Sequence, residues 1–484
     1  MLFNSYLFIL LFLPVFLMGY FLLGKSSKYE YSKIWLIAMS FLFYAYMHFE
    51  YALLLLGSIL INYGIIRWME KQKKSRKWLL VLGIICNLFP LFICKYYNFF
   101  IDNINLVFKG KIPLIEFILP IGISFITFQQ LSFLLDCYKD KKLRFSLIDY
   151  VAYISFFPKI SSGPIVLFQE FLPQIQDTKA KRPRYDNLSK GIYQFAMGLA
   201  KKILLADTLA KLVAIGFADI GNLHTGSALI VMLSYSLQLY FDFSGYSDMA
   251  IGVALMLNIK LPDNFNSPYK SISVSDFWKR WHITLTRFFT KYVYIPLGGN
   301  RKGLKRTCIN VMIVFLLSGL WHGANWTFIL WGALHGILLV IERVSKRKIE
   351  KRPLIGWIFT FVFVNAAWII FRSNSLNEAF FFISRIFKPG MGPAGPALAA
   401  AINEMTEIRI LSRFGLQFIV DRAEYLPMLL FVAVSFLITI MAKNSQEKTV
   451  EFKFGRRQMA TTVLLLFWSI ISLSGVSTFL YSNF

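Results

Sequence analysis

The chain has 484 residues, of which 56% are hydrophobic and 17% aromatic. This apolar share exceeds the roughly 45–50% of soluble domains, and the composition excludes intrinsic disorder, a coiled coil and a disulfide scaffold. The formal net charge of +26 would suggest nucleic-acid binding in a soluble protein, but Lys and Arg cluster here between long apolar runs. That pattern is typical of a multi-pass membrane protein whose basic loops face the cytoplasm and anionic lipid headgroups, so we expect membrane lipids and no nucleic acid as partners.

Apolar segments in the first 145 residues alternate with basic clusters. The run Tyr6–Leu23 lacks a basic leader and a cleavage site, which predicts a retained transmembrane helix rather than a signal peptide. Further spans are expected over Ile34–Met47, Tyr51–Met69, Trp78–Cys94 and Phe117–Cys137. Every second boundary carries a strong Lys/Arg cluster, which predicts cytoplasmic ends there and an N-terminus outside.

The region from about 145 to 300 is less regular. Leu147–Pro158 is too short to cross a membrane, since a crossing needs about 20 residues. It runs into a breaker-rich turn, so we expect a re-entrant or interfacial segment whose backbone is satisfied by protein or water. A helix over Leu188–Phe217 is interrupted by Lys201–Lys202, and Ala228–Asn258 is a strong apolar span with polar residues inside it.

Basic residues flank the apolar stretch Cys308–Ile341 on both sides, which predicts a helical hairpin. Each leg holds about 14 residues, or roughly 21 Å at 1.5 Å per residue. Because a hydrocarbon core is roughly 30 Å thick, the apex near His322 and Gly323 is expected inside the membrane.

The remaining expected spans are Pro353–Phe371, Leu426–Met441 and Met459–Leu480, which brings the total to roughly ten to twelve. The segment 373–425 contains a Pro- and Gly-rich run, which predicts a loop. The alternation of charge places it outside, as an extracytoplasmic insertion in a single membrane-embedded domain spanning 1–484.

Three histidines in or beside apolar segments are the candidate catalytic residues. His322 is expected at membrane depth, where an ionisable side chain is costly and indicates function; the alternative is a neutral ring satisfied by Ser318, one turn earlier. His282 lies among alternating aromatics and cations, and both an interfacial and a functional role stay open. His335 lies between glycines, which favours a structural hydrogen bond in close helix packing.

Two carboxylates, Asp242 and Asp248, lie six residues apart inside an apolar span. Because buried carboxylates need partners, we expect them to pair with basic residues of the following helix or to orient a histidine, with structural pairing favoured. No metal site is expected, because the histidine spacings match no zinc signature. The cysteines lack CxxC spacing, which predicts buried thiols without a disulfide; they are Cys86, Cys94, Cys137 and Cys308.

Taken together, these segments resemble the membrane-bound O-acyltransferase family, and most closely the branch of the alginate O-acetyltransferase membrane subunit. The resemblance covers nearly the whole chain, and its motifs are specific in combination. They are Asn4–Phe8, Phe157–Pro158 with Gly163–Ile165, Tyr240–Asp248, Asn264–Tyr269, Asp276–His282 and Gly319–Gly323.

The resemblance implies an all-α polytopic fold, a ring of tilted transmembrane helices with re-entrant or interfacial helices around a central tunnel. The catalytic histidine of the family falls on His322 and its second polar position on His282. The implied reaction moves an acetyl group from a cytoplasmic thioester to a hydroxyl outside. The residues expected to support the site are Asp242, Asp248, Trp321, Ser318, Asn325 and His335.

The resemblance implies no permanently bound cofactor, with acetyl-CoA or another acyl thioester as the donor. The expected acceptor is an exported cell-envelope polysaccharide, reached directly or through an extracytoplasmic acetyltransferase partner, and the expected location is the inner membrane. Peptidoglycan is another possible acceptor. The alternatives are D-alanyl transfer to teichoic acid within the same family and a transporter or flippase without covalent chemistry. The absence of an internal repeat argues against a transporter.

Overall fold

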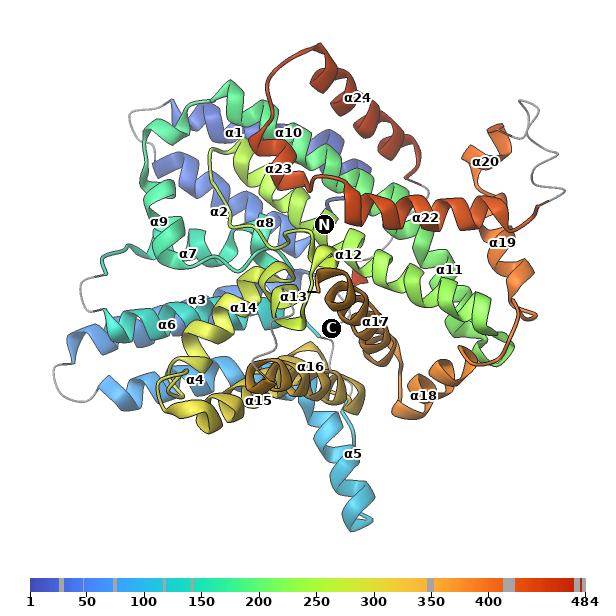
Figure 1. The fold of residues 1–484 in the computed structure, drawn as a ribbon. Helices are drawn as coiled ribbons and strands as arrows, with labels where there is room; N and C mark the ends of the chain where they lie inside the picture. Colours follow the sequence, from blue (N-terminus) through green and yellow to red (C-terminus); the bar gives the residue numbers. More distant parts are fainter. Residues whose placement is uncertain are drawn as a thin grey trace.

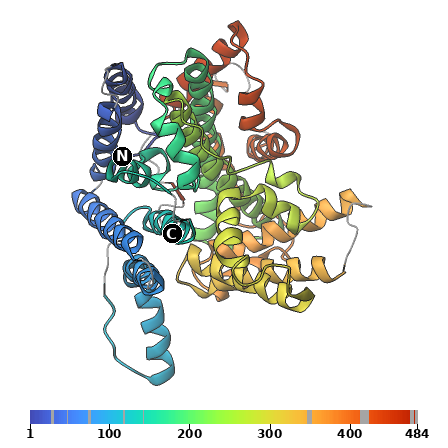
Figure 2. The same ribbon diagram turned by 90° about the vertical axis from the view of Figure 1, so that its left-hand side faces the viewer.

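The computed structural model describes residues 1–25, 30–46, 48–72, 76–115, 119–140, 143–345, 352–411, 423–473 and 479–480. These residues form helices and no β-strand. Figure 1 shows α12, Thr225–Met256, and α17, Pro353–Arg372, near the middle of the molecule, with other helices arranged around them. The helix α5, Tyr97–Phe108, projects away from this body in both views (Figures 1 and 2) and has no buried residue. The expected all-α polytopic fold is confirmed.

Six helical stretches in the described part of the chain are long and apolar enough to cross a membrane. They are Leu7–Gly24 (η1 and α1), Phe49–Lys71 (α3), Arg76–Phe108 (α4, η2 and α5), Gly303–His322 (α15), Trp326–Ser345 (α16) and Pro353–Arg372 (α17). The expected total of ten to twelve therefore includes shorter helices. Among these, α22 has the expected bounds, Leu426–Met441.

The other elements are shorter, and several are interrupted. The α-helices are α2 (Glu30–Ala45), α6 (Ile123–Lys139), α7 (Leu147–Ser155), α8 (Phe157–Ile160), α9 (Phe168–Gln176), α10 (Tyr185–Ala200), α11 (Asp207–Ala218), α13 (Val274–Arg280), α14 (Ile283–Phe289), α18 (Leu376–Arg385), α19 (Gly395–Asn403), α20 (Thr406–Leu411), α23 (Ser445–Val450) and α24 (Arg456–Ile471). The π-helical turns are η1 (Leu7–Phe12), η2 (Phe92–Tyr96), η4 (Lys201–Ala206) and η7 (Thr290–Tyr294).

The irregular middle of the chain has the predicted interruptions. Leu147–Pro158 forms the short helices α7 and α8, neither long enough to span a membrane. The helix expected over Leu188–Phe217 breaks at Lys201–Lys202, where η4 separates α10 from α11. Parts of the expected spans Phe117–Cys137 and Met459–Leu480, and residues 412–422 of the expected insertion, lie outside the described residues.

The helices α15 and α16 form the expected hairpin, but its expected leg length is wrong. Each leg has 20 residues, about 30 Å at 1.5 Å per residue, because the helices extend into the basic flanks. The short-leg argument for the membrane depth of His322 therefore fails. The legs pack closely through glycine: a Cβ on Gly319 would lie 2.3 Å from the Phe328 carbonyl oxygen, and one on Gly332 equally close to that of Phe315.

The segment 373–425 is more helical than expected, since it contains α18, α19 and α20. Its Pro- and Gly-rich turn is held against the N-terminus of α12. The backbone N–H of Thr225 donates to the Lys388 carbonyl at 2.6 Å, and that of Gly226 donates to the Gly390 carbonyl at 2.8 Å. These bonds give the free N–H groups of the first turn of α12 a partner. Its position outside the membrane stays a prediction.

The two carboxylates of α12 are paired with lysines of η4. Asp248 lies 2.6 Å from the Nζ of Lys201, and Asp242 lies 2.7 Å from that of Lys202. Structural pairing is thus confirmed, but the basic partners belong to the preceding segment and not to the following helix. The π-helical turn places two consecutive lysines against α12. The helices α10 and α12 also lie close together, since a Cβ on Gly198 would lie 2.6 Å from the Gly245 carbonyl oxygen.

We expect Asp242→Asn to lower the free energy of unfolding by about 3 kcal/mol, because it leaves the buried Lys202 ammonium with one carboxylate fewer. The matched control is Asp186→Asn, which removes the exposed partner of Lys190 and should cost about 0–1 kcal/mol. Denaturation of the purified protein in one detergent compares the two variants. Equal losses would contradict a stabilising role for the buried pair.

Candidate functional site

His322 is the last residue of α15 and is 2% exposed. Its imidazole is enclosed by aromatic rings from three helices. The ring centroids of Trp321, Trp331 and Phe371 lie 4.8, 5.1 and 5.1 Å from that of His322. The hairpin α15–α16 and the end of α17 therefore bring the predicted histidine into a dry aromatic pocket. Packing by protein, and not leg length, buries this side chain.

The end of α15 is held by two residues of the π-helical turn η2. The Nζ of Lys95 donates to the Trp321 carbonyl at 2.7 Å, and the hydroxyl of Tyr96 donates to the Leu320 carbonyl at 3.0 Å. The last carbonyls of a helix lack partners within the helix, so these bonds fix the turn that carries His322. Lys95 was not among the predicted site residues; the only signal in the sequence was a lysine directly after the apolar run Trp78–Cys94. The structure places it in a π-helical turn, and such turns often occur at functional sites.

We expect Lys95→Met to lower acyl transfer about tenfold and to destabilise the protein by about 1–3 kcal/mol, because it leaves the buried Trp321 carbonyl without its donor. Lys111→Met is the control, since Lys111 is exposed beyond α5. Transfer activity and unfolding are measured for both variants. Wild-type activity in Lys95→Met would show that the clamp on α15 does not position His322.

His282 lies at the break between α13 and α14 and is fully buried. The side chain is thus enclosed by protein, and whether His282 lies at the depth of the membrane interface stays a prediction. Its backbone has φ +45°, a left-handed conformation that is uncommon outside glycine and concentrates at functional sites. Ser273 N-caps α13, since its side chain accepts from the Asp276 N–H. The Nδ1 of His282 lies 3.1 Å from the Oδ1 of Asn264, a residue that sequence reasoning quoted only as part of a motif.

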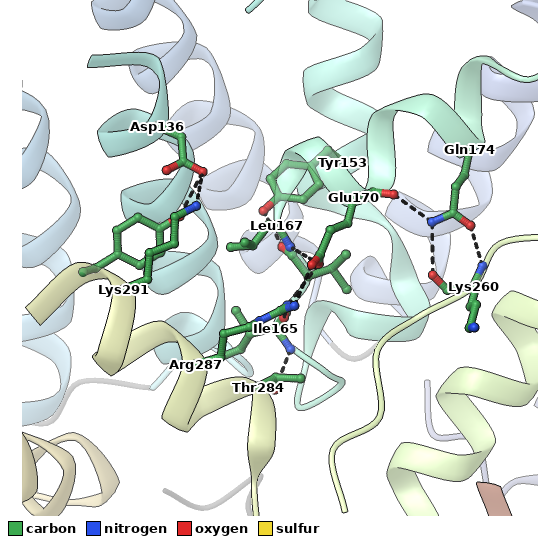
Figure 3. Close-up of polar contacts among 12 residues, drawn as sticks. Asp136, Tyr153, Ile165, Leu167, Glu170, Gln174, Lys260, Thr284, Arg287 and Lys291 are labelled. Atoms are coloured by element: carbon green, nitrogen blue, oxygen red, sulfur yellow. Dashed lines mark hydrogen bonds and ion pairs between the residues drawn. The ribbon is translucent and has the colours of Figure 1, made fainter. Parts of the chain in front are cut away.

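The helix α14 is anchored to the segment between α8 and α9, which fixes the position of His282. Figure 3 shows Thr284 and Arg287 facing this segment. The Ile165 N–H donates to Thr284 Oγ1 at 3.0 Å, and the guanidinium of Arg287 donates to both carboxylate oxygens of Glu170, at 2.6 and 3.0 Å. Arg287 also donates to the Ile165 carbonyl at 3.0 Å.

The two candidate catalytic histidines share one aromatic neighbour. The Trp321 indole has its centroid 6.1 Å from that of His282 and 4.8 Å from that of His322. His335 lies beside Trp331, a residue of the His322 pocket, with its ring 4.9 Å from that indole. Its Nδ1 accepts the indole N–H of Trp278 at 3.2 Å, which is the structural hydrogen bond expected for it.

The other predicted supporting residues have different surroundings. Asn325 caps α16, because its Oδ1 accepts the Thr327 N–H at 3.0 Å while its Nδ2 donates to the Asn374 carbonyl. Asp242 and Asp248 belong to the lysine pairs of η4, and within the described residues neither is hydrogen-bonded to a histidine. They support the fold rather than the histidine pair.

Ser318 lines a cavity of about 860 Å³ between α13, α14, α15 and α16. Trp278 and Phe315 are among the apolar residues that line it, whereas Lys279, Arg280 and Arg343 add positive charge. The cavity thus reaches within one helical turn of His322. A larger cavity of about 1200 Å³, bordered by η4, α22 and α24, has no histidine in its wall. Within the described ranges, no three His, Cys, Asp or Glu side chains form a group that could hold a metal ion.

Comparisons with known proteins match most of the chain. The model of the membrane-bound O-acyltransferase family matches residues 122–379. The chain is 39% identical to the peptidoglycan O-acetyltransferase of Helicobacter pylori, covering 100% of this chain and 98% of the relative. It is 39% identical to the probable alginate O-acetylase AlgI of Pseudomonas aeruginosa, covering 81% and 75%. It is 28% identical to the teichoic acid D-alanyltransferase of Bacillus subtilis, covering 78% and 99%.

Proposed function

Because the chain belongs to the membrane-bound O-acyltransferase family, we propose that it moves an acetyl group from a cytoplasmic thioester to a hydroxyl outside the inner membrane. The protein is an O-acyltransferase with several membrane-spanning helices. The observation that carries the proposal is the position of His322. This buried imidazole lies at the end of a clamped helix, one turn beyond a cavity with cations in its wall.

The 860 Å³ cavity is the proposed donor site. An acyl thioester such as acetyl-CoA has a long, uncharged arm that ends in phosphate groups. The apolar wall at Trp278 and Phe315 suits the arm, and Lys279 and Arg343 suit the phosphates, because guanidinium and ammonium groups form strong charge-assisted hydrogen bonds with them. Two carboxylates also line the cavity: Asp276, which is paired with Arg280, and Glu342. Arg343 lies in the last turn of α16, on the basic side that the charge pattern assigns to the cytoplasm.

The proposed chemistry uses neutral His322 as a general base. The oxygen of the acceptor hydroxyl attacks the thioester carbonyl carbon while His322 takes the hydroxyl proton. The carbon–sulfur bond then breaks, and the sulfur takes the proton back from the imidazolium, so the products are an ester and a thiol.

The proposed acceptor is a cell-envelope polysaccharide, reached directly or through an extracytoplasmic acetyltransferase partner. The relatives named for peptidoglycan and alginate acetylation, each 39% identical, support acetyl transfer. D-alanyl transfer to teichoic acid is the second candidate reaction, because the chain is 28% identical to a teichoic acid D-alanyltransferase.

The test is base-releasable acetate on exported envelope polysaccharide, compared between cells that lack the protein and cells complemented with the intact chain. We expect acetate to return with complementation, and membrane vesicles containing the purified chain to consume labelled acetyl-CoA. If acetate is equal in both strains while ester-linked D-alanine differs, the donor is a D-alanyl thioester. If neither ester differs, the acyltransferase assignment for envelope polysaccharide fails.

A further inference from the structure

The hydrogen bonds around His282 determine which of its two nitrogens carries the hydrogen. Three groups converge on one side-chain atom of Asn264: the Thr284 N–H at 3.3 Å, the Thr284 Oγ1 at 2.9 Å and the His282 Nδ1 at 3.1 Å. A backbone N–H only donates, so the Asn264 atom it meets is the carbonyl oxygen and not the amide nitrogen. The Nδ2 of Asn264 points the other way, 3.5 Å from Ser247 Oγ.

The orientation of Asn264 fixes the tautomer of His282. A carbonyl oxygen only accepts hydrogen bonds, so His282 Nδ1 must carry a hydrogen and donate it. Complete burial lowers the pKa of His282, which keeps the ring neutral. In a neutral ring with its hydrogen on Nδ1, Nε2 holds a lone pair. This Nε2 is buried and has no hydrogen-bond partner within the part of the chain that the structure describes.

The position of Asn264 is itself held from several sides. Its backbone carbonyl accepts the Ile283 N–H at 3.0 Å, so backbone and side chain both bind the segment that follows His282. Thr284 Oγ1 accepts the Ile165 N–H (Figure 3). It therefore directs its own hydrogen to Asn264 Oδ1. The left-handed turn at His282 brings these groups to one carbonyl oxygen.

We propose that Asn264 is a positioning residue that holds His282 with its hydrogen on Nδ1, so that Nε2 accepts a hydrogen bond from a second hydroxyl of the polysaccharide acceptor and orients that acceptor, while His322 takes the proton of the reacting hydroxyl. This role rests on the proposed acyltransferase function. In many sites a hydrogen-bond partner on one ring nitrogen fixes the orientation and tautomer of a histidine, and its other nitrogen contacts the ligand or substrate. Asn264 is the corresponding partner of His282 Nδ1. The Trp321 indole is a neighbour of both imidazoles, so His282 and His322 belong to one cluster of rings.

The tautomer is measured without any reaction. The intact chain, labelled with ¹⁵N-histidine and held in lipid nanodiscs, gives distinct NMR signals for protonated and unprotonated ring nitrogens, and His282→Gln assigns those of His282. We expect a protonated Nδ1 and an unprotonated Nε2 in the wild type, and a mixture of tautomers in Asn264→Leu. A wild-type Nε2–H signal would overturn the proposal even if acyl transfer is demonstrated. A confirmed tautomer in a protein without acetyl transfer would reject the proposed function instead.

The kinetic test compares two substitutions of Asn264. Asn264→Leu should lower kcat about tenfold or more, because a displacement of the acceptor by about 1 Å can reduce catalysis about 10²-fold, while the donor KM stays unchanged. Asn264→Asp keeps an acceptor for Nδ1 and should recover activity at alkaline pH. Its carboxylate stabilises the imidazolium and raises the pKa of His282, so activity is lost at a higher pH on acidification than in the wild type.

Ser247→Ala is the matched control, since it removes the contact of Asn264 Nδ2 and leaves Oδ1 untouched. We expect wild-type kcat and an unshifted pH profile for this variant. The positioning role is rejected if Asn264→Leu has wild-type kcat. It is also rejected if Asn264→Asp shows the same loss as Asn264→Leu with no shift in its pH profile, because that result indicates packing alone.

Discussion

Cells complemented with His322→Ala are expected to carry no more base-releasable acetate on their envelope polysaccharide than cells without the protein. The loss follows from removing the general base, because general-base catalysis typically raises the reaction rate about 10²–10⁴-fold. His322→Gln should lose as much, although an amide fills more of the aromatic pocket, because glutamine cannot take a proton at neutral pH. Acetate is quantified after alkaline release, at matched levels of the protein in the membrane.

The control for this experiment is His48→Ala. His48 is exposed before α3 and makes no capping hydrogen bond from its side chain, so its removal should leave acetate at the wild-type level. Full acetate with His322→Ala would refute the mechanism. Full acetate with His322→Gln alone would show that shape and hydrogen bonding, rather than proton transfer, are required at this position. A transporter with an intact pathway would tolerate that glutamine.

Local patterns in the sequence predicted the elements whose limits depend on local chemistry. Leu426–Met441 is bounded as expected, since an apolar run is followed by a lysine and a proline lies near its start. The interruption at Lys201–Lys202 was also predicted, because two consecutive lysines break the apolar run there. The leg length of the hairpin was wrong, because the helices continue through charged residues: α15 begins at Gly303, before Lys305 and Arg306.

The sequence predicted the histidines of the candidate site, but it did not predict the residues that are hydrogen-bonded to them or to their helices. His322 and His335 lie in unusual motifs that the sequence displays directly. Lys95, in contrast, contacts a carbonyl 226 positions further along the chain, a pairing that only tertiary packing creates. The role of Asn264 is likewise visible only in the structure, where the left-handed turn at His282 brings the Nδ1 of that ring to the Oδ1 of Asn264. One sequence without long-range contact information cannot distinguish such residues from ordinary polar loop residues.

Gly319→Ala is expected to be strongly destabilising and to abolish acyl transfer, although no part of its side chain enters the chemistry. Its Cβ would lie 2.3 Å from the Phe328 carbonyl oxygen, a backbone atom of the facing leg that cannot turn aside as a side chain does. The two legs must separate, at a cost of about 1–3 kcal/mol or more for overpacking. The separation moves His322 relative to Trp331, and displacements of about 1 Å can reduce catalysis about 10²-fold.

The control is Gly57→Ala in α3, where a Cβ meets no atom within 4 Å. That substitution should stabilise the protein by about 0.5–1 kcal/mol, because alanine loses less conformational freedom in a helix than glycine. Thermal unfolding and acetate release are measured on both variants. Opposite signs of the stability change are expected from the same chemical substitution. If Gly319→Ala keeps wild-type stability and activity, close contact between α15 and α16 is not what holds His322 in place.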